Sequence, residues 1–346
     1  MKPALRGRAE ALLQRLWYAR DPGVTLQVLR ACLAPLTQFT ACTARRSRSR
    51  LRTLGAAQPP LVVVGNLVAG GAGKTPLVAA IATALAARGL RPGIVASGYG
   101  ATRRDARLVR PGDDPAVAGD EPLLLAQATA LPVAAGRDRA AAVACLLAAH
   151  PQLDLVISDD GLQHATLARS VELVVFDERG VGNGRLLPAG PLRAPLAQAA
   201  AMDALVLNGD APAPIAHPRQ FRFRIEPQRF VAIDGHAAPL TPQAFVHHAH
   251  GHPLVAIAGI AAPQRFFATL RALGLQAQCV EPGDHATLGP AELAALPGEF
   301  IVMTAKDAVK CSAWADRRCW ALEVRAVADP ALIDWLTETI RGRTPA

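Results

Sequence analysis

The chain has 346 residues, of which 51% are hydrophobic and 19% are charged, and its formal net charge at pH 7 is +9. It is too long for one small domain, and it has enough apolar residues for a large core, either in two domains or in one α/β unit with an extension. The positive charge favours an anionic partner such as nucleic acid, an acidic membrane surface or a phosphorylated substrate, although a generic Arg-rich surface would give the same balance.

Six cysteines are scattered along the chain without a C-x-x-C pair, which fits neither a zinc site nor a disulfide framework. A reducing, cytosolic setting is the simplest interpretation. The first 17 residues lack the short uninterrupted apolar core of a cleavable signal peptide.

Residues 22–42 form an apolar stretch that is interrupted by Arg30, Pro35 and Gln38. Such a stretch is a poor bilayer-spanning segment, which needs about 20 mostly apolar residues. The run RRSRSRLR follows at residues 45–52. An apolar helix beside an arginine cluster indicates a helix that lies in the interface of an anionic membrane; the alternative is a helix packed on the domain beside a solvated basic turn.

A glycine-rich loop follows the apolar run LVVVG. It departs from the pattern G-x-x-x-x-G-K-[ST] at Val68, and at Ala69 it lacks the signature lysine of partitioning ATPases. A strand, clustered glycines and a helix N-terminus still direct backbone N–H groups at a phosphate, so we predict a nucleotide site. Lys74 would reach the β- and γ-phosphates, and the Thr75 hydroxyl would ligate Mg²⁺. The predicted phosphate-binding residues are Gly70, Gly71, Ala72, Gly73, Lys74 and Thr75.

Beyond this loop, short apolar runs typical of strands alternate with helical stretches. This alternation predicts a doubly wound parallel sheet of the P-loop NTPase type. The strand-like runs lie at residues 93–97, 154–158, 171–177 and 203–209.

Two acidic pairs lie near the expected nucleotide. Asp159 and Asp160 end the strand-like run DLVIS. Carboxylates at the carboxyl end of a strand beside a phosphate loop favour Mg²⁺ binding over the alternative of solvated loop acids. Asp120 and Glu121 precede a helical stretch, where Asp120 could instead serve as the helix N-cap.

A proline-rich break at residues 210–218 predicts a linker. The alternating stretch at 221–233 is typical of an antiparallel pair, and a second α/β series starts near residue 254. We therefore expect two α/β domains with a hinge near residue 215. The predicted units are an N-terminal interfacial membrane helix region (1–52), a P-loop domain (53–214) and a second, smaller α/β domain (215–346).

The second domain offers two further motifs. Asp284 and His285 form a carboxylate–imidazole pair in a turn, for which a plain surface turn is the alternative. The run TAKD at 304–307 is similar to a guanine-reading [NT]-K-x-D, but its lysine stands one position late, which disfavours a GTPase. Aromatic residues are sparse and give no RNA-binding pattern, so we expect no nucleic-acid partner.

Eight motifs occur in one order along the chain: VVVGNLVAGGAGKTPLV, GYG, GDEPLLLA, SDDGLQH, VVFDERGVGNGRLLPAGPLR, AGIAAPQRFF, GDH and MTAKDAVK. Together they resemble the tetraacyldisaccharide 4'-kinase family, the lipid A 4'-kinases of Gram-negative bacteria. The resemblance covers about residues 10–340, and its DDGLQH and FDERGVGNGRLLPAGPLR stretches are far more specific than the phosphate loop.

The resemblance implies an enzyme that uses ATP and Mg²⁺. It would transfer the γ-phosphate to the 4'-hydroxyl of a lipid substrate, tetraacyldisaccharide 1-phosphate, and form lipid IV A. It also implies a place on the cytoplasmic face of the inner membrane, where an acyl-chain substrate can be reached. The sequence carries no signal for an oligomeric state.

The resemblance also implies roles for single residues. Lys74 and Thr75 match the phosphate-loop lysine and the Mg²⁺-ligating hydroxyl. Asp120 and His285 match a catalytic pair in which the carboxylate orients the imidazole and helps to take the sugar hydroxyl proton. Closure of the hinge would bring this pair together. The other matches are Glu121, Asp159 and Asp160 near the metal and phosphates, and Arg193 and Asn183 as candidate substrate-binding residues.

Three positions depart from the family pattern. Ser97 stands where an arginine is usual, and Ala194 and Ala305 stand where glutamate is usual. The phosphate loop, the acidic pairs and the Asp–His pair are intact, so we expect an active enzyme with altered binding at these positions. The rival functions are a partitioning-type ATPase, which Ala69 disfavours, and a non-catalytic membrane or nucleic-acid binder.

Overall fold

The computed structural model of the chain describes residues 12–19, 21–49, 58–98, 100–102, 105–164, 166–210, 212–283 and 288–342, without the side chains of residues 47–49. Within these ranges the strands form one sheet of 12, in the order β10-β9-β11-β12-β8-β7-β6-β1-β5-β2-β4-β3. The strands are β1 (Leu61–Gly65), β2 (Pro92–Ala96), β3 (Arg107–Val109), β4 (Val133–Ala135), β5 (Leu155–Asp159), β6 (Val171–Phe176), β7 (Ala204–Asn208), β8 (Gln220–Ala232), β9 (Leu254–Ile257), β10 (Gln278–Val280), β11 (Phe300–Thr304) and β12 (Cys319–Ala328).

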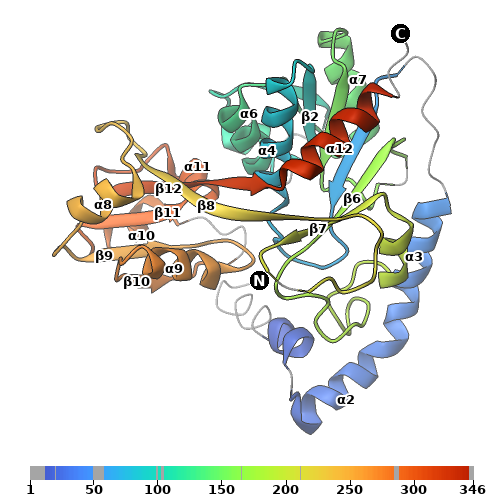
Figure 1. Ribbon diagram of the computed structural model, residues 1–346. Coiled ribbons are helices and arrows are strands. Elements are labelled where there is room, and N and C mark those ends of the chain that lie inside the picture. Colours follow the sequence, from blue (N-terminus) through green and yellow to red (C-terminus); the bar gives the residue numbers. More distant parts are fainter. Residues whose placement is uncertain are drawn as a thin grey trace.

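Helices and a 12-stranded, mostly parallel sheet confirm the predicted α/β fold class (Figure 1). The helical segments are α2 (Gly23–Leu33), η1 (Ala34–Leu36), α3 (Thr37–Ser49), α4 (Lys74–Ala87), α5 (Pro115–Ala118), α6 (Asp120–Thr129), α7 (Arg139–Ala149), η2 (Leu196–Ala201), α8 (Pro242–His248), α9 (Pro263–Ala272), α10 (Pro290–Ala294), α11 (Ala305–Cys311) and α12 (Pro330–Arg341).

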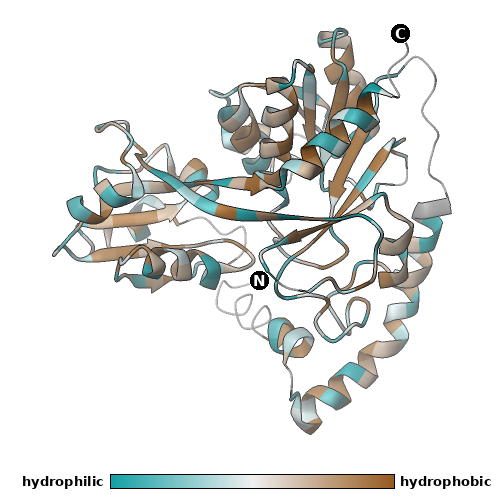
Figure 2. Cartoon of the chain, viewed as in Figure 1, coloured by the Kyte–Doolittle hydropathy of each residue, from teal (hydrophilic) through white to brown (hydrophobic). Residues whose placement is uncertain are grey.

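Helices cover both faces of the sheet around β1, which pairs in parallel with β5 and β6. Successive side chains of a strand point to opposite faces, and both faces of β1 are apolar. Val62 and Val64 join the core cluster of α4, α6 and α12, whereas Leu61 and Val63 join the cluster of α7. This double coverage explains why the strands near the phosphate loop are continuous apolar runs. Figure 2 shows the same apolar colouring along these strands.

The long strands β8 and β12 join the two halves of the molecule (Figure 1). The alternating stretch that the sequence predicts as an antiparallel pair is one strand, β8, and its antiparallel partner is β12, about 90 residues later. Its alternation reflects a half-exposed ribbon: Phe223 and Phe230 are buried, while Arg224 and Arg229 are exposed. The sheet is therefore continuous across the predicted hinge.

The second half consists of β9, β10, β11 and the adjoining parts of β8 and β12, with α8 to α11 around them. Its strands also carry apolar residues on both faces, which pack in two further clusters. Helix α12 returns to the first half, where Leu332, Leu336 and Ile340 pack in the same cluster as α4. The final helix of the predicted second domain thus stabilises the P-loop half, and the division at residues 214 and 215 stays a prediction.

An N-terminal helical arm runs along one edge of the first half (Figure 1). Residues 12–18 are helical, and α2, η1 and α3 follow, with Pro35 in the 3₁₀ turn between the two longer helices. Hydrogen bonds tie the arm to the loop that follows β6: Trp17 Nε1 donates to the Pro188 carbonyl at 3.0 Å and Thr40 Oγ1 to that of Leu187 at 2.8 Å. Among the described residues, none of the helices is long and apolar enough to cross a bilayer.

Candidate active site

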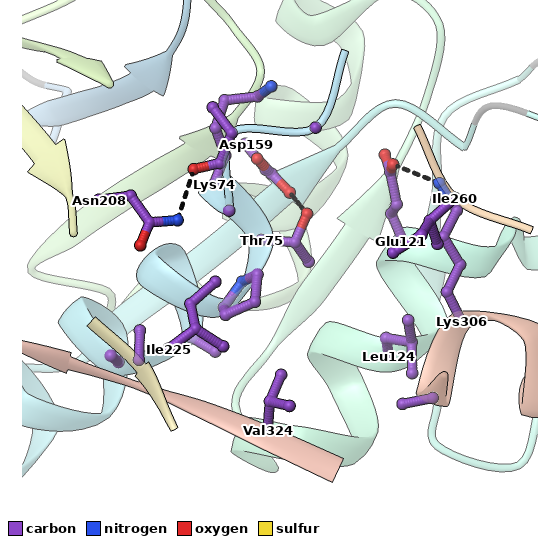
Figure 3. A pocket seen from close by; sticks show the side chains of 18 of the residues that line it. Lys74, Thr75, Glu121, Leu124, Asp159, Asn208, Ile225, Ile260, Lys306 and Val324 are labelled. Atoms are coloured by element: carbon purple, nitrogen blue, oxygen red, sulfur yellow. Dashed lines mark hydrogen bonds and ion pairs between the residues drawn. The ribbon is translucent and has the colours of Figure 1, made fainter. Parts of the chain in front are cut away.

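A cleft of about 1700 Å³ lies between the two halves. One wall is formed by the glycine loop, α4, the start of α6 and the end of β5. The opposite wall comes from the loop after β9, from α9 and from the start of α11. The β8–β12 ribbon crosses the cleft, where Ile225 and Val324 are partly exposed (Figure 3). An elongated ligand such as a nucleotide fits a cleft of this size.

The glycine loop runs from the end of β1 to the first turn of α4. Gly73 is left-handed (φ 83°) and caps α4, and a Cβ there would lie 2.7 Å from Asn208 Nδ2 and 2.8 Å from Ile225 Cδ1. Only glycine fits this position without strain or collision. Gly70 is also left-handed (φ 99°). The loop therefore brings its backbone N–H groups to the helix N-terminus, an arrangement suited to binding phosphate.

Lys74 is nearly buried at the start of α4. Its Nζ donates to Asn66 Oδ1 at 3.1 Å and lies 3.5 Å from Asp160 Oδ1. The Asn66 amide nitrogen donates in turn to the carbonyls of Val68 and Gly70, at 2.6 Å and 3.1 Å. Asn66 thus shapes the loop and aims the lysine, a role that the sequence reasoning missed. Its place directly after the β1 strand is the signal that could have found it.

Thr75 and Asp159 are paired beside the loop. The Thr75 hydroxyl donates to Asp159 Oδ2 at 2.7 Å, while the buried Asp159 Oδ1 has no hydrogen-bond partner (Figure 3). Burial, with the charge of Glu121, raises the pKa of Asp159 to about 7, against the opposing effects of Lys74 and Thr75. An unpaired, desolvated carboxylate oxygen beside a hydroxyl fits a divalent cation.

The donor set suits Mg²⁺ better than a metal held by protein alone. Among the described residues, no three acidic, histidine or cysteine side chains are grouped to hold a metal ion. Mg²⁺ keeps several waters and takes one or two carboxylates together with substrate phosphates. Thr75 and Asp159 provide such a partial shell next to the glycine loop.

Asp160 and Arg193 continue the polar wall. Asp160 is left-handed (φ 50°), and Arg193 Nη1 donates to its Oδ2 at 3.1 Å. Burial raises the pKa of Asp160, but the charges of Lys74 and Arg193 outweigh it and hold that pKa below its usual value. Asp160 therefore stays ionised between two cations, whereas for Asp159 the effect of Lys74 does not outweigh burial and the charge of Glu121.

The start of α6 lies in direct contact with α11 at the edge of the cleft. Gly119 is the N-cap of α6, and Asp120 is its first helical residue and not the cap that the sequence leaves as an alternative. Lys306 Nζ donates to Glu121 Oε1 at 3.1 Å (Figure 3). Lys310 Nζ lies 3.8 Å from Asp120 Oδ2. The two acids of the first half thus meet two lysines of the second half.

Comparison with known proteins decides the family. A family model described as tetraacyldisaccharide-1-P 4'-kinase matches residues 29–341. The chain belongs to this kinase family. A tetraacyldisaccharide 4'-kinase from Bordetella parapertussis is 44% identical over 347 residues (96% of this chain, 97% of the relative), and one from Dechloromonas aromatica is 45% identical over 289 residues (83% and 86%).

A solved structure supports the same family. The crystal structure of LpxK from Aquifex aeolicus, an "apo" form in complex with ATP, is similar to this chain with a TM-score of 0.73 and 25% sequence identity. The match covers 92% of this chain and 100% of that one. The ATP bound in that structure agrees with a nucleotide cleft at the glycine loop.

Most of the site residues predicted from the sequence line the cleft, but not all of them do. The structure brings the glycine loop, Lys74, Thr75, Glu121, Asp159, Asp160 and Arg193 to one cleft. Asn183 lies elsewhere: its amide donates to the carbonyls of Leu16 and Ala189, at 3.2 Å and 2.9 Å, and so ties the N-terminal arm to the loop after β6. His285 and Asp284 lie outside the described residues, so their roles stay predictions.

A second cluster under the glycine loop was missed as well. Arg179 Nη2 donates to the Gly71 carbonyl at 3.0 Å and to Asp177 Oδ2 at 2.7 Å. Arg265, from α9 of the second half, reaches the same Asp177 oxygen at 3.1 Å. Asn208 Nδ2 donates to the Ala72 carbonyl at 3.2 Å (Figure 3). The family motif FDERGVGNGRLLPAGPLR held the signal for Asp177 and Arg179, because it is polar directly after a strand.

The three departures from the kinase-family pattern occupy different environments. Ser97 and Ala305 line the cleft, at the end of β2 and the start of α11. Ala194 is buried and packs with Leu192 and Leu205 in an apolar cluster. A glutamate at position 194 would need a polar partner that this cluster does not provide, so the wall beside Arg193 is more apolar here.

Proposed function

We propose that this chain transfers the γ-phosphate of ATP to the 4'-hydroxyl of tetraacyldisaccharide 1-phosphate and so forms lipid IV A. The observation that supports it best is the convergence of Lys74, Thr75, Glu121 and Asp159 in one cleft of a chain that belongs to this kinase family. A plain binding protein would not need a buried, unpaired carboxylate oxygen beside a phosphate-binding loop.

The donor phosphates are held by the glycine loop. The backbone N–H groups from Gly70 to Thr75 bind the β- and γ-phosphates, and Lys74 leaves Asn66 and Asp160 to neutralise their charge. Thr75 and Asp159 would hold Mg²⁺, with Glu121 as a further candidate. When bound, the ion neutralises charge that develops on the phosphates.

Acceptor activation is assigned to the rim of the same cleft. The 4'-hydroxyl oxygen bonds to the γ-phosphorus while the bond from that phosphorus to the β–γ bridging oxygen breaks, and ADP departs with that electron pair. The hydroxyl proton passes to the pair formed by Asp120 and His285. Asp120 is the first residue of α6, next to Glu121 of the cleft wall, and Lys310 of the second half lies 3.8 Å from its carboxylate.

The test is ATP-dependent phosphorylation of tetraacyldisaccharide 1-phosphate in detergent, with ADP and lipid product measured together. Stoichiometric lipid product and ADP support the kinase. ADP release that does not depend on the acceptor would favour the rival ATPase, and a folded protein that binds ATP without either activity would contradict the proposal.

We also propose that the N-terminal arm places the enzyme on the cytoplasmic face of the inner membrane. In α2 no residue is buried, and Val24, Val28, Leu36 and Phe39 are among the most exposed large apolar residues of the described chain. Val24 and Val28 lie one helical turn apart on α2, and Leu36 and Phe39 follow in η1 and α3. These four exposed residues are the apolar stripe of the arm. Arg45 and Arg46 are exposed at the end of the arm and suit an anionic surface.

Phe39→Ser is expected to weaken binding to vesicles that contain phosphatidylglycerol by about 30-fold, because burying a phenyl ring contributes about 2 kcal/mol. Co-sedimentation with vesicles measures the effect. Gln38→Ser is the matched control, since Gln38 is an exposed polar residue of the same helix and should change little. Equal binding of the wild type and Phe39→Ser would contradict membrane docking through this stripe.

A further inference from the structure

Lysine is rare in this chain, and two of its four lysines line the cleft. Only four of the 37 Lys and Arg residues are lysine: Lys2, Lys74, Lys306 and Lys310. Lys74 and Lys306 line the cleft, and Lys310 contacts Asp120 at its edge. Lysine carries a compact, rotatable point charge, whereas arginine carries a planar fork. The cleft wall also carries arginines, among them Arg193 and Arg265, so Lys74 and Lys306 add two compact ammonium charges to a wall that is already basic.

Several hydrogen bonds and ion pairs fix the position of helix α11, which carries Lys306. The helix begins directly after β11, and the side chain of Thr304 caps it by accepting the Asp307 N–H. The buried Asp307 carboxylate accepts the Gly259 N–H at 2.9 Å and the Thr304 hydroxyl at 2.6 Å. Lys310, one turn later, lies 3.3 Å from Asp307 and also contacts Asp120. The start of α11 is thus fixed both to its own half and to α6.

Lys306 faces the phosphate region from the half opposite the glycine loop. Its side chain is only 17% exposed, and its Nζ is 3.1 Å from Glu121. Glu121 is itself close enough to Asp159 to perturb that carboxylate electrostatically. Figure 3 shows the Lys306–Glu121 pair and the Thr75–Asp159 pair on neighbouring walls of the same pocket.

We propose that Lys306 is a catalytic residue that contacts the γ-phosphoryl group of ATP. Lys74 neutralises this group from the loop side, and Lys306 supplies a second cation from the other half when the acceptor and ATP are both bound. Charge spreads over the equatorial oxygens of the transferred group, so a cation aimed there stabilises the transition state more than the ground state. Lys306 takes no part in proton transfer, because the hydroxyl proton passes to the Asp120–His285 pair. The inference rests on the proposed kinase function.

The alternative is an ion pair that only joins α6 to α11. A partly exposed ion pair contributes little to stability. Arginine would serve such a pair at least as well as lysine, because its guanidinium binds carboxylates in a bidentate manner. The two roles therefore predict different results for Lys306→Arg.

The experiment compares Lys306→Ala and Lys306→Arg with the wild type. The readouts are kcat at saturating ATP and acceptor, and the Kd of a fluorescent ATP analogue without acceptor. We expect Lys306→Ala to lower kcat about 10²-fold with a Kd change below about 3-fold. Lys306→Arg should recover only part of this loss, and added methylamine should partly restore Lys306→Ala. Arg91→Ala, which removes a surface ion pair with Asp154 far from the cleft, should match the wild type.

Three outcomes would overturn the assignment of Lys306. They are a Lys306→Ala enzyme within about 3-fold of wild-type kcat, a loss confined to nucleotide Kd, or a Lys306→Arg enzyme equal to the wild type without any rescue by methylamine. Lack of transfer by the wild type would instead refute the kinase function itself, and with it the proposed role of Lys306. Full transfer by both the wild type and Lys306→Ala would refute the role of Lys306 but not the kinase function.

Discussion

Lys74→Met is expected to lower kcat for phosphoryl transfer by about 10³-fold, because the β- and γ-phosphates lose their neutralising charge on the loop side. Methionine keeps an unbranched apolar stem in the nearly buried space at the start of α4. Asn66 loses one hydrogen-bond donor, while Asp160 keeps Arg193 as a partner at 3.1 Å. The fold should therefore survive, which makes the loss of activity interpretable. Transfer of ³²P from ATP to the lipid acceptor measures the rate.

The control for Lys74→Met is thermal unfolding of both proteins without ligand. A shift of a few degrees is acceptable, since one partly compensated buried contact is removed. ATP should raise the Tm of the wild type more than that of the variant, because Lys74 binds the nucleotide in the ground state as well. Transfer by Lys74→Met within about 10-fold of the wild type would refute the assignment of the glycine loop as the donor site.

Asp159→Asn is expected to have the second largest effect, a loss of about 10²- to 10³-fold in kcat/KM. Asparagine has nearly the same shape, and its carbonyl oxygen can still accept the Thr75 hydroxyl, which now donates to Asp159 at 2.7 Å. What disappears is the negative charge at the buried, unpaired Oδ1. The variant should need a much higher Mg²⁺ concentration for half-maximal activity.

Asp154→Asn is the matched control for Asp159→Asn. Asp154 directly precedes β5, at the opposite end of the strand from Asp159, and pairs with Arg91 on the surface. The Asp154→Asn variant should need the same Mg²⁺ concentration for half-maximal activity as the wild type. A second readout, the shift in Tm on adding Mg²⁺ with a non-hydrolysable ATP analogue, should shrink in Asp159→Asn only. An unchanged Mg²⁺ dependence in Asp159→Asn would move the metal to other side chains.

The sequence by itself determined the class of fold and the donor half of the site. Apolar runs that alternate with helical stretches require a parallel sheet covered on both faces, and β1, β5 and β6 show this burial. The glycine loop and the acids after β5 could be predicted because each follows directly from a strand end. These are local patterns, in which residues close in the chain stay close in space.

The tertiary structure decided the contacts that join distant segments. The sequence predicts an antiparallel pair at residues 221–233, since alternation gives the exposure of each residue but not the partner strand. Pairing with β12 makes one continuous sheet and returns α12 to the first half. Asn183 belongs to the motif FDERGVGNGRLLPAGPLR, but its side chain contacts the N-terminal arm and not the cleft.

The same holds for the side chains that complete the cleft. Lys306 on α11 and Glu121 on α6 are 185 positions apart in the chain. No pattern within either helix predicts their 3.1 Å contact. Arg265 and Asp177 meet in the same way across the two halves. Short-range order fixes each element because backbone hydrogen bonds and apolar periodicity act within a few residues. Which elements face each other depends on how all the apolar faces are buried together, and only the folded chain shows that result.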